Sequence, residues 1–204
     1  MFYEPSKGHG LPHDPFKAIV APRPIGWIST ISALGGVNLA PYSFFNVISP
    51  NPLMVWFSSG GAKDSVTYAR DTGEFVANLV GRDLAGKMNE TSVDAPRGVS
   101  EFEHVGLIAA PCFLVRPPRV ANAPAALECK VTDIYEPVGL NGRRSRSQVV
   151  IGEVVGVHIG DEFLKDGMFD VVKAGNVARL GYFDFSTTEQ VFPLRRPKWS
   201  EDAV

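Results

Sequence analysis

The stretch Ala21–Asn46 has the sequence APRPIGWISTISALGGVNLAPYSFFN. Its first half is rich in β-branched and aromatic residues, and a Gly35-Gly36 pair separates it from a second extended run that begins at Val37. Two such runs joined by a short glycine-containing loop are typical of a β-hairpin. Because proline cannot donate a hydrogen bond to a neighbouring strand, we expect the second run to leave the sheet near Ala40-Pro41.

Small polar side chains are frequent around Ala40-Pro41, where we expect the strand to leave the sheet, and large aromatic side chains lie next to them in the sequence. Hydroxyls and backbone amides can hold phosphate oxygens, and backbone groups freed from a sheet can match the edge of a heterocycle. A flat ligand with a phosphate would suit such a surface, but an ordinary hairpin with solvated serines and threonines is the simpler interpretation of these residues alone. The polar set is Arg23, Ser29, Thr30, Ser32, Asn38, Tyr42, Ser43 and Asn46, and the flat set is Trp27, Tyr42, Phe44 and Phe45.

A second candidate anion site follows the hairpin. Leu53–Ser58, LMVWFS, is a short apolar run that predicts a strand buried on both faces. Asp64 is a candidate N-cap for a helix that would end at Gly73. Serine hydroxyls, Lys63 and unpaired helix amides would then converge on an anion, although a plain loop before a capped helix fits equally well.

Several motifs, in order along the chain, resemble the flavin reductase-like, FMN-binding split-barrel family. The resemblance covers most of the chain between about Ala21 and Phe185. In one place the sequence departs from the family pattern, because Tyr182 follows Gly181 where the family has a second glycine. The matching motifs are RPIGWIST, the glycine turn, NLAPYSFFN, FSSGGAKDS, EFVANLV at Glu74–Val80, PPRVANAPAALECK at Pro117–Lys130 and NVARLG at Asn176–Gly181.

The resemblance implies an FMN site near the interface of a homodimer. It assigns the phosphate to the hairpin and to the strand-to-helix segment, at Ser29, Thr30, Ser58, Ser59 and Lys63. The ring system should be bordered, partly through backbone groups, by Ala40, Pro41, Tyr42, Ser43 and Asn46. Trp27 either supports the ring stack or belongs to the core.

The rest of the sequence predicts a single domain with a mainly β fold and a few short helices, in a small closed or split antiparallel β-barrel. The resemblance implies the split antiparallel β-barrel. We expect strands at 75–80, 113–115, 126–134 and 149–159, with Gly152 and Gly156 bending the last one. A short helix is expected at 82–90 and an irregular surface loop at 94–105, where Glu101, Glu103 and His104 would be solvated. The domain would span residues 19–185, between an N-terminal arm (1–18) and a C-terminal arm (186–204).

Three other groups of residues have both a functional and a structural interpretation. His9, His13 and Asp14 suggest a metal site, but a solvated tail explains them more simply. Arg143, Arg144 and Arg146 could meet the phosphates of a nicotinamide cofactor, or form a solvated hairpin tip. His158 is more simply a packed or hydrogen-bonded strand residue than a catalyst.

The composition sets limits on partners and location. A net charge of −2 gives no electrostatic reason to expect nucleic acid or an anionic membrane as a partner. Cys112 and Cys129 make neither a disulfide framework nor a CxxC metal motif. With no signal-peptide core and no apolar run of about 18 residues, a cytoplasmic protein is the simplest expectation.

The predicted function is an NAD(P)H:flavin oxidoreductase that passes electrons to an acceptor or a partner oxygenase. Hydride chemistry at the flavin N5 needs no catalytic acid or base from the protein. An FMN-binding electron carrier or sensor is the alternative, and a β-barrel module without flavin is a third. GxSxG, HExxH, P-loop and GxGxxG motifs are absent from the sequence, so hydrolase, zincin and Rossmann functions have no support.

Overall fold

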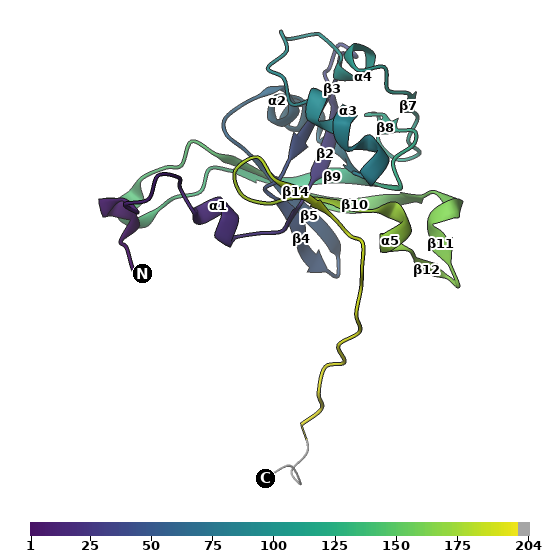
Figure 1. Ribbon diagram of the computed structural model, residues 1–204. Helices are drawn as coiled ribbons and strands as arrows, with labels where there is room; N and C mark the ends of the chain where they lie inside the picture. The colour runs from purple at the N-terminus through teal and green to yellow at the C-terminus, as the bar shows by residue number, and fades with distance from the viewer. Residues whose placement is uncertain (200–204) are drawn as a thin grey trace.

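The computed structural model describes residues 1–199, which form a mainly β structure with a few short helices (Figure 1). Its main sheet has seven strands in the order β3-β2-β6-β9-β10-β5-β4, and every neighbouring pair is antiparallel. The sheet curls into a half-barrel, which confirms the predicted split antiparallel barrel. The strands are β2 (Gly26–Ile31), β3 (Val37–Tyr42), β4 (Phe45–Pro50), β5 (Leu53–Ser59), β6 (Glu74–Leu79), β9 (Ala125–Tyr135) and β10 (Gln148–Ile159).

Shorter strands and helices surround this sheet. The small sheets are β1 (Arg23–Pro24) with β13 (Val177–Arg179) and β14 (Phe185–Thr187), β7 (Ala109–Ala110) with β8 (Arg119–Val120), and β11 (Leu164–Lys165) with β12 (Met168–Phe169). The α-helices are α1 (Phe16–Ile19), α2 (Asp64–Thr72), α3 (Ala85–Glu90), α4 (Glu101–His104) and α5 (Val171–Ala174). The 3-10 helices are η1 (Pro5–Lys7), η2 (Arg82–Leu84), η3 (Leu140–Gly142) and η4 (Asp161–Phe163).

The β2–β3 hairpin packs against a different hydrophobic cluster on each of its two faces. Successive side chains of a strand point to opposite faces, so neighbouring residues enter different clusters. Ile28 packs in one cluster with Val66 of α2. Its neighbour Trp27 packs in a second cluster with Met88 of α3 and Phe102 of α4. The helices α2, α3 and α4 gather over this end of the sheet in Figure 1, so the hairpin lies between them. Within residues 1–199, no helix has both the length and the apolar character that crossing a bilayer requires.

The strand β3 does not leave the sheet at Ala40-Pro41, so that expectation was wrong. Pro41 pairs with Trp27 and the strand continues to Tyr42. β3 is an edge strand, and the N–H of Leu39 points outward to Glu101 rather than to β2. Pro41, two residues further on, therefore also lies at an outward-facing position, where no neighbouring strand needs its missing N–H.

Two further strand expectations need correction. Residues 113–115 form no strand, because the backbone N–H groups of Phe113, Leu114 and Val115 all donate to the carboxylate of Glu128 instead of to a neighbouring strand. β5 is not buried on both faces, since buried and partly exposed residues alternate along it.

The bends expected in the long strand β10 are confirmed. Its register with β9 shifts between Ile151 and Gly152 and again between Val154 and Gly156. A Cβ atom at Gly152 would overlap the ring of Phe75, with Cζ only 2.7 Å away. The glycine therefore lets the barrel close tightly over this aromatic side chain.

The two ends of the chain differ in how they lie on the barrel. The N-terminal segment includes η1 and α1, and its His13 ring makes an edge-to-face contact with Tyr182 at 5.8 Å. The segment after β14 extends away from the barrel in Figure 1 and leaves Phe192, Leu194 and Trp199 exposed. Residues 200–204 of the expected C-terminal arm lie outside the described residues.

Candidate functional site

Two adjoining clefts open beside the edge strand β3, with volumes of about 530 and 280 Å³. They share the side chains of Pro41 and Tyr42. The larger cleft continues along the end of β5, the start of α2 and the loop after α3, while the smaller one continues toward Lys17, Arg23 and Arg179. Volumes of this size are typical of small-ligand and cofactor sites.

The corner of the larger cleft between β5 and α2 has the features of an anion site. Ser59 is 1% exposed, and its buried Oγ has no hydrogen-bond partner. Side chains added at Gly60 or Gly61 would meet no atom within 4 Å, so the turn between strand and helix is open. No side chain caps the N-terminus of α2. Free helix amides and an unpaired hydroxyl in one corner can together hold phosphate oxygens.

Two basic side chains border this corner, each paired with a carboxylate. Lys63 Nζ lies 2.8 Å from Asp94, and Arg97 Nε lies 3.0 Å from Asp64. The hydrogen bond with Asp94 raises the pKa of Lys63 and lowers the pKa of Asp94. The Lys63–Asp94 pair and the Arg97 side chain are largely exposed, whereas the Asp64 side chain is 24% exposed, so an incoming anion can replace Asp94 at small cost. Asp64 is the first residue of the helix rather than its N-cap, a position that belongs to Lys63.

Glu101 anchors the inner wall of the larger cleft. Its carboxylate accepts hydrogen bonds from Asn38 Nδ2 at 3.1 Å and from the backbone N–H of Leu39 at 2.8 Å. Asn38 Oδ1 in turn accepts from Ser65 Oγ at 2.6 Å, which links β3 to α2. Glu101 is buried in the short helix α4, so the expectation that it would be solvated in an irregular loop was wrong.

The smaller cleft has a strongly basic lining. Arg23 is buried and donates hydrogen bonds to the backbone carbonyls of Lys17, Val20 and Leu180, while its Nε has no partner. Burial, together with the nearby charge of Arg179, lowers the pKa of Arg23. In the shared wall, burial raises the pKa of the Tyr42 phenol.

The structure brings most of the predicted site residues to these clefts. Ala40, Pro41, Tyr42, Ser59 and Lys63 line the larger cleft, and Ser43 and Ser58 line the smaller one. Asn38 of the polar set also lines the larger cleft, and Arg23 of that set lines the smaller one. Sequence reasoning assigned no site role to several other lining residues, among them Lys17, Ser65, Thr91, Ser92, Asp94, Arg97, Arg179 and Tyr182. These residues come mainly from loops, where no periodic pattern marks them.

Four predicted residues lie elsewhere. Trp27 is fully buried in the core and donates from Nε1 to Thr91 Oγ1 at 2.9 Å. The Ser29 hydroxyl donates to the carbonyl of Pro118, and Thr30 lies within 3.5 Å of Asn38 Oδ1; both are fully buried behind β3 rather than on the cleft. Asn46 is exposed on β4 and accepts a hydrogen bond from its neighbour Val47.

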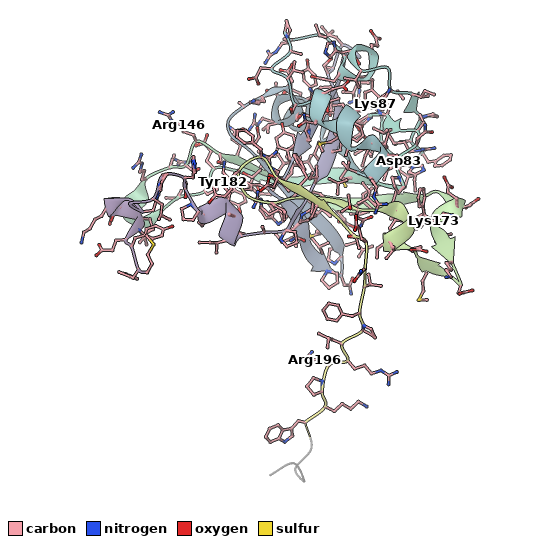
Figure 2. The ribbon with its side chains drawn as sticks, in the orientation of Figure 1. Asp83, Lys87, Arg146, Lys173, Tyr182 and Arg196 are labelled. Atoms are coloured by element: carbon pink, nitrogen blue, oxygen red, sulfur yellow. The ribbon has the colours of Figure 1, made fainter. Side chains whose placement is uncertain are left out.

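The remaining candidates lie away from the clefts. The three arginines at 143, 144 and 146 are exposed on the hairpin between β9 and β10, where Figure 2 labels Arg146. His158 is hydrogen bonded to Glu128, as the structural interpretation expected. Burial raises the pKa of the neighbouring Cys112 thiol to about 12, so it is no thiolate nucleophile.

Residues 20–178 match the model of the flavin reductase like domain. The chain belongs to this family. An uncharacterized protein of Halalkalibacterium halodurans is 33% identical over 188 residues, which are 90% of each chain. The family assignment agrees with the fold.

Three solved structures share this flavin reductase-like fold. Nitrilotriacetate monooxygenase component B from Bacillus cereus superposes with a TM-score of 0.85 at 24% identity, covering 95% of this chain and 98% of its own. The 2-nitrobenzoate 2-nitroreductase of Pseudomonas fluorescens gives 0.80 at 27% identity, covering 93% and 92%. A candidate flavin reductase with a split barrel domain from Shewanella frigidimarina gives 0.79 at 22% identity, covering 89% and 90%.

The residues present fit an FMN molecule. The phosphate would meet the unpartnered Ser59 hydroxyl, the uncapped end of α2 and Lys63. The flat wall at Pro41 and Tyr42 offers the apolar surface that a ring system needs.

Proposed function

We propose that this protein binds FMN in the larger cleft and acts as an NAD(P)H:flavin oxidoreductase. The observation that carries the proposal is the buried, unpartnered hydroxyl of Ser59 beside the uncapped N-terminus of α2. A buried polar atom without a partner costs about 1–3 kcal/mol, and a phosphate oxygen would remove that cost. Lys63 and Arg97 supply positive charge at the same corner.

The wall shared by the two clefts would border the flavin ring. The outward position of Pro41 leaves its backbone carbonyl free of strand pairing, and Tyr42 adds an aromatic side chain with a protonated hydroxyl. When bound, FMN would supply the hydride chemistry, taking two electrons from a nicotinamide and passing them onward. The protein's own residues would bind and orient the ring and limit its contact with water.

The smaller cleft would admit the second reactant. Its basic lining of Lys17, Arg23 and Arg179 favours an anionic molecule such as NADH or NADPH, or an anionic electron acceptor. Support for an oxidoreductase comes from the family and from the nitroreductase and monooxygenase component that share the fold. By analogy with the monooxygenase component, an oxygenase is the partner that we propose.

We further propose that the protein is a homodimer with FMN near the interface. The edge strand β4 exposes Val47 and Ile48, and the C-terminal segment exposes Phe192 and Leu194 away from its own barrel. Apolar surface of this kind is typical of a surface that a second chain covers.

The test is the absorbance spectrum of the purified protein before and after anaerobic addition of NADH or NADPH. We expect a bound flavin band near about 450 nm that the nicotinamide bleaches. A flavin that stays oxidised would indicate an electron carrier or sensor instead of a reductase. A colourless protein that binds no added FMN would refute the proposed cofactor.

A further inference from the structure

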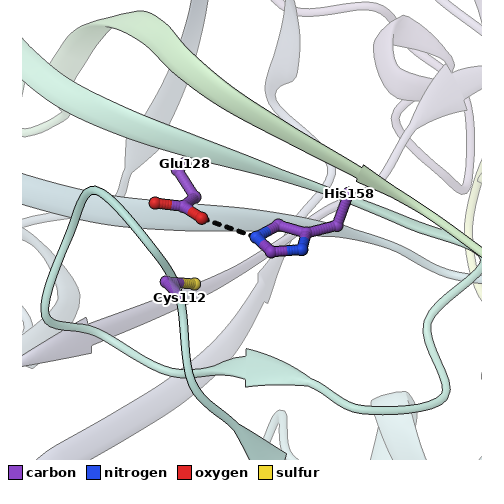
Figure 3. Close-up of side chains that lie close together, drawn as sticks. All are labelled: Cys112, Glu128 and His158. Carbon is purple, nitrogen blue, oxygen red and sulfur yellow. Dashed lines mark hydrogen bonds and ion pairs between the residues drawn. The ribbon is translucent and has the colours of Figure 1, made fainter.

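Three side chains of metal-binding types meet outside the two clefts, at Cys112, Glu128 and His158 (Figure 3). They come from three segments: the loop between β7 and β8, strand β9 and strand β10. One ligand atom from each residue lies within 4.8 Å of the other two. None of the three lines either cleft, so flavin binding gives no reason for this arrangement.

The loop that carries Cys112 also holds the carboxylate of Glu128 in a fixed orientation. Oε1 accepts a hydrogen bond from the N–H of Phe113 at 2.9 Å, and Oε2 accepts from Leu114 at 2.6 Å and Val115 at 3.1 Å. The Glu128 side chain is 1% exposed. Although burial raises the pKa of Glu128, these N–H donors and His158 outweigh it and leave the pKa below its usual value. Neighbouring donors that orient a ligand in this way are a regular feature of metal sites.

The imidazole is also held in place. Nε2 of His158 lies 2.5 Å from Glu128 Oε1, and the Phe113 ring stacks on the imidazole with a centroid separation of 5.4 Å and an interplanar angle of 14°. Figure 3 shows the imidazole pointing toward Glu128, with the sulfur of Cys112 below both side chains in this view. The His158 side chain is 15% exposed and Cys112 is only partly buried, so an ion has a path from solvent.

We propose that Cys112, Glu128 and His158 bind one zinc ion. Thiolate sulfur, imidazole nitrogen and carboxylate oxygen are all ligands that Zn²⁺ accepts, and three protein ligands leave the fourth tetrahedral position for water. A carboxylate has about four lone-pair positions, three of which take N–H donors here. The ion would take the fourth position, now used by the imidazole.

Binding would require only small movements. Metal–ligand distances of about 2.0–2.3 Å place tetrahedral ligand atoms about 3.3–3.8 Å apart. Nε2 and Oε1, now 2.5 Å apart, would therefore separate by about an ångström. The sulfur already lies within 4.8 Å of one ligand atom from each of these two residues, a gap that side-chain rotation can close. On binding, the Cys112 thiol would release its proton to solvent, and His158 would coordinate through unprotonated Nε2.

Isothermal titration of the chelator-treated, full-length protein with ZnCl₂, with elemental analysis after dialysis, tests the proposal. We expect one zinc per chain in the wild type. Cys112→Ser and His158→Gln should each weaken binding by more than the roughly 10–100-fold that loss of an outer-shell partner costs, since each removes a ligand. The matched controls are Cys129→Ala, because that thiol lies in the core among Phe75 and Val150, and His13→Gln in the N-terminal segment. Both controls should bind zinc as the wild type does.

Thermal unfolding of each variant without zinc shows whether it folds, and Cys112→Ser changes one atom only, so it is the decisive variant. Failure of the wild type to bind zinc, or equal binding by the wild type and Cys112→Ser, would overturn the proposal. Such a result would mean that the three residues only secure the loop by hydrogen bonds. Because the cluster lies outside the clefts, either outcome is independent of the absorbance test for FMN.

Discussion

The hydroxyl of Ser59 is buried at the larger cleft without a hydrogen-bond partner, whereas those of Ser29 and Thr30 already have partners inside the protein. Of these three hydroxyls, only that of Ser59 would gain a hydrogen bond without losing one when a phosphate binds. A hydrogen bond to a charged group contributes about 1.5–3 kcal/mol.

We therefore expect Ser59→Ala to lower FMN affinity about tenfold, since 1.4 kcal/mol is a factor of ten, and to leave riboflavin affinity unchanged. Riboflavin lacks the phosphate and so serves as the matched ligand. Fluorescence titration with both flavins measures the two affinities. The Ser29→Ala/Thr30→Ala double variant is the comparison. If FMN affinity falls in the double variant but not in Ser59→Ala, while riboflavin affinity is unchanged in both, the phosphate binds at the hairpin and not at Ser59.

Glu101 is a second residue whose neighbours determine its role. Glu101→Gln replaces one acceptor oxygen by an NH₂ group, which then faces a donor on Asn38 or Leu39. We expect this change to lower the free energy of unfolding by about 2 kcal/mol, as measured by urea denaturation. The exposed neighbour Glu103 is the control, and Glu103→Gln should change the free energy by less than about 0.5 kcal/mol. Equal effects of the two changes would contradict the anchoring role of Glu101.

At the scale of elements, the end of α2 depends on the backbone of one residue. Gly73 has φ = 71°, in the left-handed region, and a Cβ there would meet no atom within 4 Å. Gly73→Ala should therefore destabilise the protein by about 1 kcal/mol through backbone strain alone. Gly86 inside α3 has equally open space without a positive φ, so Gly86→Ala should stabilise by up to about 1 kcal/mol. Opposite shifts in melting temperature are expected, and shifts of the same sign would contradict this account.

Elements that depend on local pattern were predictable from the sequence. The β2–β3 hairpin, α2 with its terminal glycine and the bends of β10 each follow from turn glycines or from apolar runs. The segment 113–115 has the same apolar composition as a strand, but the Glu128 carboxylate, 13 to 15 residues further along the chain, takes its backbone donors. No local pattern reports a contact of this kind.

The candidate site was predictable to a similar extent. Residues on β3 and at the β5–α2 turn were assigned through the family resemblance, because the local patterns there fit a plain hairpin and a plain capped helix at least as well. The contributions of the 91–97 loop and of Arg179 depend on how distant segments meet, so sequence pattern alone did not reveal them. Glu101 was missed for a related reason: its helix α4 is four residues long, too short for a clear helical period.

At the scale of the whole molecule, the C-terminal segment is the part that its own barrel does not use. We expect deletion of residues 191–204 to weaken the association of the proposed dimer at least about tenfold. The deletion removes the exposed side chains of Phe192 and Leu194, which would otherwise pack on the second chain. Sedimentation velocity over a range of concentrations measures the association, and far-UV circular dichroism checks that the barrel is intact. A wild-type monomer, or a truncated chain that dimerises as well as the full one, would contradict the proposed arrangement.

The outer rim of β3 affects how this protein behaves at high concentration. An extended peptide that adds to a sheet needs a row of free main-chain donors, and unprotected edges of this kind promote aggregation. Here the donor of Leu39 is occupied by a carboxylate, and the next outward position is an imino acid with no hydrogen to give. A foreign strand thus finds no row of free donors at these two positions, so this edge can border the ligand cleft and still offer little for a second sheet to pair with.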